Sequence, residues 1–188
     1  MKTIKDNIVN KIEINKSIFI TEIIKVNDIN NVKDILKNIK EKYKDATHYC
    51  YAYIIDDYKK SSDDGEPGGT AGVPIMDTLN KLELNYILCV VIRYFGGIKL
   101  GAGGLVRAYR KSVSDALKDK EFNELVNGYK LTIEVSYDKQ KDIEYILKDN
   151  YKKTYKENVI YEIECNKEIK EKLKGFNIIK EEEKVIEI

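Results

Sequence analysis

The sequence predicts an α+β protein of two domains. Stretches of alternating apolar and polar residues indicate strands, and apolar residues three and four apart indicate helices. The pattern starts again near Asn127-Gly128. The length of 188 residues suits one large or two small domains, and an apolar content of 43% is enough for a core. We therefore expect a first domain over residues 1–126 and a second over residues 129–188, with the boundary at 125–129.

The first domain is expected to open with two strands over residues 8–26, joined by a turn at Asn15-Lys16. Asp28 is a favourable N-cap, and the apolar residues that follow it as far as Tyr43 have helical spacing. Residues 48–55 alternate again and predict a strand. Its tyrosines face one way, and the other face carries His48, Cys50, Ala52 and Ile54.

Turn-forming residues fill positions 56–72, which predicts a long loop. Pro74 suits the first position of a short helix. Residues 86–95 are nearly all apolar, as is typical of a strand buried on both faces. A loop with several glycines follows, and then a helix to about residue 121.

The second domain is expected to have the order β-α-β-β-α-β. Strands are predicted at 131–135, 151–156, 159–165 and 185–188, with helices around 143–147 and 169–173. Gly175 ends the second helix. This order is that of a ferredoxin-like module.

Composition excludes several classes of protein. There is no apolar run of about 18 residues, which a membrane span needs, and Met1–Asp6 has no apolar stretch of a secretion signal. Three widely spaced cysteines do not make a disulfide framework or a zinc ribbon. We expect a reduced, cytoplasmic protein with no cofactor and no membrane partner. The net charge of +1 argues against a wholly basic nucleic-acid binder but allows a local basic patch.

One block of the chain concentrates glycine and arginine. Nine of the 11 glycines and all three arginines lie between residues 65 and 110, and five cations but no acid lie between Leu84 and Ser114. A glycine loop that opens onto a helix presents free N–H groups and the positive end of the helix dipole to an anion. Glycines also let a phosphate approach the backbone. The candidate phosphate-binding residues are Arg93, Gly96, Gly97, Lys99, Gly101, Gly103, Gly104, Arg107 and Arg110.

The helix after the glycine loop has two distinct sides. One side carries Leu105, Val106, Tyr109, Val113, Ala116 and Leu117, and the other carries Arg107, Arg110, Lys111, Ser114 and Lys118. An ordinary solvated face explains the second side equally well, and the glycines can be tight turns without a ligand. The use of arginine in a lysine-rich chain favours phosphate, because its planar fork binds phosphate with two hydrogen bonds.

Arg93 has two open interpretations. It shares a strand face with apolar residues, and a buried cation needs a partner. Asp64 or Glu66 can supply a structural salt bridge, or Arg93 can reach a ligand at the end of the strand.

A second candidate group consists of His48, Asp63, Asp64 and Glu66, a possible ligand loop or a site for a metal that prefers oxygen. An ordinary Asp-Gly turn, with acids paired to nearby cations, explains the loop as well. His48 and Cys50 share a strand face, which allows a Cys/His nucleophile. A buried thiol beside a hydrogen-bonded histidine is the competing interpretation.

Three motifs of the expected first domain resemble the YigZ/IMPACT family. They are Ala46-Thr-His-x-Cys-Tyr-Ala52, Asp63-Asp-Gly-Glu-Pro-x-Gly-Thr-Ala-Gly72 and Arg93-Tyr-Phe-Gly-Gly-Ile-Lys-Leu-Gly-Ala-Gly-Gly-Leu-Val-Arg-Ala-Tyr109. The resemblance covers about residues 1–125. The second domain is similar, in order and length, to the ferredoxin-like module that follows in bacterial YigZ proteins.

The resemblance implies a first domain with the β-α-β fold of a small-subunit ribosomal protein's second domain, which domain IV of elongation factor G shares. It implies a second domain similar to domain V of that factor. Eukaryotic relatives restrain a translation-initiation kinase by competing for its ribosome-associated activator. For bacterial members the resemblance implies no settled reaction.

We therefore expect a translation-associated protein without enzymatic activity, with RNA or the ribosome as its partner. It would bind phosphates through the glycine loop and the basic helix. One alternative is an enzyme or sensor of a small phosphorylated ligand, in which Asp64 or Glu66 holds a divalent cation and Arg93 stabilises charge. Another is a protein-interaction regulator of a translation-stress pathway. The sequence does not indicate an oligomeric state.

Overall fold

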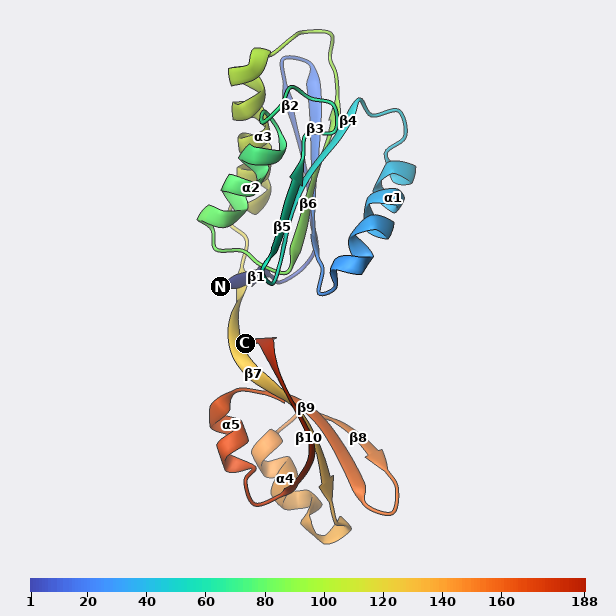
Figure 1. Cartoon of the computed structure of the whole chain (residues 1–188), viewed down its shortest axis with the longest axis vertical. Coiled ribbons are helices and arrows are strands. Elements are labelled where there is room, and N and C mark those ends of the chain that lie inside the picture. Colours follow the sequence, from blue (N-terminus) through green and yellow to red (C-terminus); the bar gives the residue numbers. More distant parts are fainter. The chain divides into compact units, whose positions relative to one another are not determined.

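The chain forms two compact units, which we describe separately. The computed structural model covers residues 1–188, and the units are residues 1–123 and 124–188. The division lies beside the predicted boundary, within strand β7 (Phe122–Val135). Each unit has an antiparallel sheet with helices packed on it (Figure 1). The predicted α+β class is confirmed. None of the helices is long and apolar enough to cross a membrane.

The sheet of the first unit contains five antiparallel strands. Their order is β2 (Ile8–Ile14), β3 (Ser17–Lys25), β6 (Ile87–Tyr94), β4 (His48–Ile55) and β5 (Tyr58–Ser62). The predicted hairpin is confirmed, and both residues of its turn have the positive φ angles that a tight turn needs (47° and 64°). The prediction of an unbroken loop over residues 56–72 was wrong, because β5 occupies its first part. This strand lies at the edge of the sheet, and its polar, largely exposed residues leave no apolar alternation to detect.

Helices cover both faces of this sheet (Figure 1). On one face lie α2 (Gly72–Lys81) and α3 (Gly101–Leu117), and on the other lie the short helix η1 (Ile29–Asn31) and α1 (Val32–Lys42). This arrangement explains why β6 is buried on both sides, as predicted. It also explains the two faces of β4, whose tyrosines pack toward α1 while Cys50, Ala52 and Ile54 join the core under α2 and α3.

Several boundaries differ from the sequence-based expectation. Asp28 Oδ1 does accept a hydrogen bond from the Asn30 N–H (2.9 Å), but it caps η1, and α1 begins only at Val32. Helix α3 ends at Leu117 instead of near residue 121. A short strand that was not predicted, β1 (Lys2–Ile4), bonds to the turn before β6 through Lys2 N–H to Glu83 O (2.9 Å).

The second unit has the predicted β-α-β-β-α-β order. Strand β7 is followed by η2 (Tyr137–Lys139), α4 (Gln140–Leu147), β8 (Lys152–Tyr155), β9 (Val159–Cys165), α5 (Lys167–Lys172) and β10 (Asn177–Glu187). Its strands lie in the order β8-β9-β7-β10, all antiparallel, as expected of a ferredoxin-like module. Helices α4 and α5 lie on the same face of the sheet (Figure 1). The last strand begins earlier than the predicted 185–188. The prediction missed this part because the strand lies at the edge of the sheet and its middle, Lys180–Lys184, is exposed and charged.

Candidate functional site

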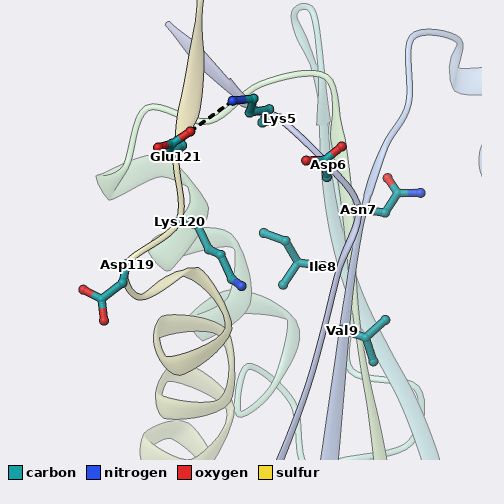
Figure 2. A pocket seen from close by; sticks show the side chains of 8 residues that line it. All are labelled: Lys5, Asp6, Asn7, Ile8, Val9, Asp119, Lys120 and Glu121. Carbon is teal, nitrogen blue, oxygen red and sulfur yellow. Dashed lines mark hydrogen bonds and ion pairs between the residues drawn. The ribbon is translucent and has the colours of Figure 1, made fainter.

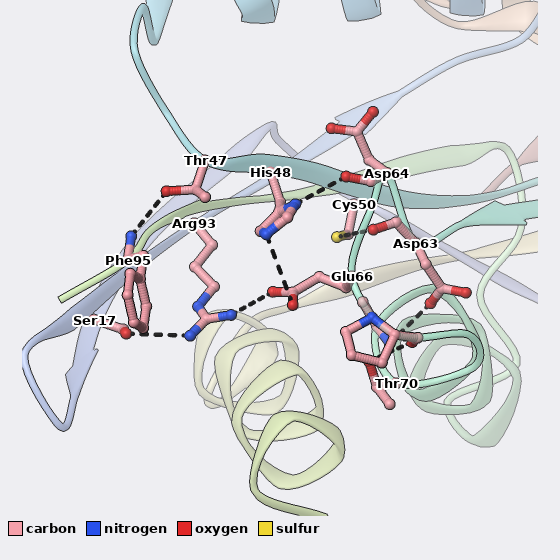
Figure 3. A network of polar contacts seen from close by, with 12 residues as sticks. Ser17, Thr47, His48, Cys50, Asp63, Asp64, Glu66, Thr70, Arg93 and Phe95 are labelled. Atoms are coloured by element: carbon pink, nitrogen blue, oxygen red, sulfur yellow. Dashed lines mark hydrogen bonds and ion pairs between the residues drawn. The ribbon is translucent and has the colours of Figure 1, made fainter. Parts of the chain in front are cut away.

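The predicted site residues form two groups at the end of the first unit's sheet. One group is a buried network around Glu66, shown in Figure 3. The other is an exposed surface at the glycine loop and the start of α3. We describe the buried network first.

Arg93 and Glu66 form a buried ion pair. Arg93 faces the α2/α3 core from β6, in register with His48 on β4 and Phe19 on β3. Its Nη1 atom donates to Glu66 Oε1 at 2.6 Å, and the two residues are only 5% and 8% exposed. This geometry favours the structural interpretation of Arg93 and identifies Glu66 as its partner. Arg93 is thereby separated from the exposed cations with which it was grouped as a candidate phosphate-binding residue.

Glu66 gathers two further groups. Its Oε1 atom also accepts a hydrogen bond from the Tyr109 hydroxyl of α3 (2.7 Å), and its Oε2 atom lies 3.8 Å from His48 Nε2. The other ring nitrogen of His48, Nδ1, lies 2.9 Å from the Asp64 carbonyl oxygen (Figure 3). His48, Glu66 and Arg93 therefore converge. Sequence reasoning missed Tyr109 as a member of this network, since its helical spacing placed it on the apolar side of the helix.

The Arg93 guanidinium lies between two aromatic rings. Its Cζ atom is 5.5 Å from the centroid of the buried Phe19 ring and 5.5 Å from that of the Phe95 ring. Nη2 is 3.4 Å from Ser17 Oγ, while the buried Nε has no hydrogen-bond partner. The cation is thus stabilised by one carboxylate and two ring faces.

Asp63 organises the loop that leads into α2. Its Oδ1 accepts hydrogen bonds from the N–H groups of Ala71 (3.0 Å) and Gly72 (2.8 Å), and its Oδ2 accepts one from Gly69 (2.8 Å). Burial acts to raise the pKa of this carboxyl, but the three backbone hydrogen bonds outweigh it and the pKa is lowered. Asp63 therefore supplies the acceptor that the start of α2 needs.

Asp64 also bonds to the backbone. Its Oδ2 accepts from the Tyr49 N–H at 2.7 Å, and its Oδ1 lies 3.5 Å from Lys40 Nζ. No group of three or more His, Cys, Asp or Glu side chains in the chain is arranged to hold a metal ion. The contacts of His48, Asp63, Asp64 and Glu66 thus favour the interpretation of this loop as a hydrogen-bonded turn.

Cys50 lies in the core beside this network. Its Sγ atom is 2.9 Å from the Asp63 carbonyl oxygen and 3.3 Å from the Tyr109 hydroxyl. Burial raises the pKa of the thiol to about 12. Because the thiolate is the nucleophile, a thiol with so high a pKa is inert at neutral pH. The buried-thiol interpretation is therefore favoured over a Cys/His nucleophile.

The exposed surface begins where the glycine loop enters α3. The first turn of this helix is Gly101–Gly104, with no acidic residue and no side chain capping it. Every other helix has a first-turn acid or a side-chain acceptor: Asp34 in α1, Asp63 for α2, Asp142 in α4 and Asn166 for α5. Free N–H groups at a helix start attract anions.

Arg107 lies over this turn. Its Nη1 atom is 3.5 Å from the position that a Cβ would take at Gly103, which places the guanidinium against the first turn of α3. Neither Arg107 nor the exposed Lys99 makes an ion pair, whereas Arg110 lies 3.6 Å from Asp77 of α2 and Lys111 lies 2.7 Å from Asp115. The sequence between Leu84 and Ser114 contains no acid, but Asp77 and Asp115 lie close to the basic side of α3 in the folded chain.

The hairpin turn of β2 and β3 completes this surface. Gly96 N–H donates to Ser17 Oγ at 3.2 Å, and a Cβ at Gly96 would overlap the backbone of Lys16. The exposed Lys16 therefore lies against the glycine loop. We call this region the glycine-loop surface, and it consists of Lys16, Phe95, Ile98, Lys99, the turn Gly101–Gly104 and Arg107.

A pocket of about 440 Å³ lies elsewhere on the first unit, between residues 5–9 and 119–121 (Figure 2). Its charged residues have both signs, and Lys5 Nζ pairs with Glu121 Oε2 at 3.1 Å. None of the predicted site residues lines it. The pocket offers neither one dominant charge nor a group of converging catalytic side chains.

Comparison with known proteins identifies a family domain within the first unit. The sequence profile of the Impact N-terminal domain matches residues 15–117. A Bacillus subtilis protein named IMPACT family member YvyE is 48% identical over 118 residues, which are 61% of this chain and 54% of that protein. The Escherichia coli protein named IMPACT family member YigZ is 36% identical over 140 residues, 72% of this chain and 69% of that one. The chain thus matches about half the length of the Bacillus relative.

A solved structure matches both units. It is a crystal structure of a protein described only as hypothetical, and it aligns with a TM-score of 0.66 and 28% sequence identity. The alignment covers 100% of this chain and 96% of the other. The likeness supports the two-sheet α+β fold over the whole chain.

Proposed function

The chain belongs to the IMPACT family, and we propose that it is a non-enzymatic binding protein whose glycine-loop surface holds the phosphates of RNA. The observation that supports this most directly is the first turn of α3. It has no cap and no acid, and Arg107 lies over it. Backbone N–H groups, a helix dipole and an unpaired arginine at one place are the elements of a phosphate site.

The chemistry of the neighbouring residues supports binding over catalysis. The carboxylates of Asp63 and Glu66 accept hydrogen bonds from other groups of the chain, and the Cys50 thiol is inert at neutral pH. The glycine-loop surface itself carries no acid or histidine to act as a general base. Its cations are exposed, as the long phosphate backbone of RNA requires.

The proposal includes a link to translation. The family resemblance supports likeness of the two units to domains IV and V of elongation factor G, and the strand order of the second unit agrees with a ferredoxin-like module. On this proposal the RNA belongs to the ribosome or to tRNA. The activity and partners of whole family members are part of the proposal, because the chain covers only about half of the Bacillus relative.

The experiment is to measure RNA binding as a function of salt for the full chain and for a Lys99→Glu/Arg107→Glu variant. The affinity of the unmodified chain should fall steeply as salt rises, because binding releases counterions. The variant should bind more weakly at low salt. Its salt slope should be shallower by about 0.7 for each phosphate of a single strand that it no longer neutralises.

The matched control is Lys33→Glu/Lys44→Glu. It makes the same change in net charge at two exposed positions, Lys33 in α1 and Lys44 just after it, and α1 covers the opposite face of the sheet. This control should keep most of the affinity. Equal weakening in both variants would show that only net charge matters and would contradict the proposed site. If the chain binds no RNA but still captures a partner protein after nuclease treatment, the protein-interaction alternative is favoured.

A further inference from the structure

Phe95 is an aromatic side chain that the fold holds at the surface. It is 46% exposed, although large aromatic residues are mostly buried. Its backbone N–H donates to Thr47 Oγ1 at 3.0 Å, and its ring lies on the Arg93 guanidinium (Figure 3). Arg93 is backed in turn by Phe19, whose ring meets Tyr109 edge-on at 5.3 Å. The ring of Phe95 is therefore supported by buried groups and still open to solvent.

The loop that follows this ring, and the turn packed on that loop, carry cations. Lys16 lies against Gly96, the residue after Phe95. Lys99 follows in the same loop, and Arg107 lies over the first turn of the helix that the loop enters. The centres of protein interfaces are depleted of lysine. A supported aromatic ring on a loop that carries lysine and leads into free backbone N–H groups is typical of sites for single-stranded nucleic acid, where bases stack and phosphates meet cations.

We infer that the glycine-loop surface binds single-stranded RNA, with one unpaired base stacked on Phe95 and neighbouring phosphates at the first turn of α3. This inference rests on the proposed function and specifies its ligand. A base inside a duplex has both faces covered by its neighbours, so only an unpaired base can stack on the ring. The exposed Ile98 (43%) adds apolar surface on the same loop.

The test uses the full chain with two substitutions of the same residue. Phe95→Leu keeps an apolar side chain over Arg93 but removes the aromatic ring, and Phe95→Tyr keeps the ring. Thermal melting of both variants checks that the fold is intact. Tyr58→Ala is the control, because Tyr58 is 63% exposed and pairs with Ile55 at the opposite end of the sheet from Arg93.

The probes are a fluorescent 12-nucleotide oligouridylate, an abasic oligonucleotide of the same length and an RNA duplex of the same length. Oligouridylate should bind more tightly than the other two. Phe95→Leu should weaken its binding by roughly 5- to 150-fold, the effect of removing one base–aromatic stack. The salt slope should not change, because the substitution leaves every phosphate-binding group in place. Phe95→Tyr and Tyr58→Ala should bind as the unmodified chain does.

The outcomes separate this inference from the proposed function. If the unmodified chain binds none of the probes, both fail. If it binds all three equally, or if Phe95→Leu binds oligouridylate as tightly as the unmodified chain, phosphate binding stands and base stacking is overturned. A Phe95→Leu variant that melts like the unmodified chain and binds oligouridylate no better than the abasic probe supports the inference.

Discussion

Glu66 connects three elements of the first unit through one carboxylate. It lies in the loop before α2, and its Oε1 atom receives hydrogen bonds from Arg93 of β6 and Tyr109 of α3. Removing one partner of a buried ion pair leaves the other charge uncompensated, which typically costs about 3–5 kcal/mol. The pair therefore fixes the position of the loop relative to the sheet. Because the Phe95 ring lies on Arg93, the pair also supports the exposed ring.

Asp63 makes the stability of the first unit depend on pH. Its pKa is lowered in the folded protein from the ordinary value of 3.8, so the folded state favours the carboxylate. This contribution to stability is complete above the unfolded-state pKa and is lost as the pH falls through the folded-state pKa. Asp63→Asn should therefore lower the free energy of unfolding by about 1–3 kcal/mol at neutral pH. The deficit should shrink below about pH 4.

Urea unfolding of both proteins across this pH range measures the effect. Asp57→Asn provides a control, since Asp57 is an exposed acid in the turn between β4 and β5. It should leave stability nearly unchanged. A deficit for Asp63→Asn that stays constant down to about pH 2 would contradict the role assigned to the carboxylate charge.

At the scale of elements, the alternation of apolar and polar residues predicted the strands that bury at least one face. The β2–β3 hairpin, β4 and β6 were predicted because each of these strands has at least one buried face, and β6 is buried on both. The edge strands β5 and most of β10 were missed, because exposed residues carry no apolar alternation.

The candidate site was predictable where burial demands a partner. An arginine among apolar residues requires an acid, and the sequence pointed to Asp64 or Glu66, of which Glu66 is the partner. The pairing of Arg110 with Asp77 was not predictable, since it depends on how α2 and α3 pack. The hydrogen bond of Tyr109 to Glu66 has the same origin.

The packing of the β2–β3 hairpin on the glycine loop requires a glycine at position 96. A Cβ there would overlap the backbone of Lys16, and backbone cannot move aside as a flexible side chain can. Gly96→Ala should therefore destabilise the first unit by about 1–3 kcal/mol, as overpacking typically does. Gly68→Ala is the control, because a Cβ there meets no atom within 4 Å. Thermal or urea unfolding compares the two. Equal stability of the two variants would contradict this close approach.

At the scale of the whole molecule, the two units have separate cores of different size. The first unit has buried clusters on both faces of its sheet, and the second has one cluster on one face. Smaller domains bury a smaller fraction of their surface and are less stable. Chains of more than one domain do not unfold as a single two-state system, so we expect each unit to have its own unfolding transition. The smaller second unit, residues 124–188, should unfold at a lower urea concentration than the first.

The three cysteines allow the unfolding of each unit to be measured in the unmodified chain. Cys50 and Cys89 lie in the first unit and Cys165 in the second, and burial raises the pKa of all three thiols. Each thiol should resist alkylation until its own unit opens. Pulsed alkylation at increasing urea, read by peptide mass spectrometry, should therefore label Cys165 first and the other two together at higher urea. Simultaneous labelling of all three would show instead that the chain unfolds as one cooperative unit.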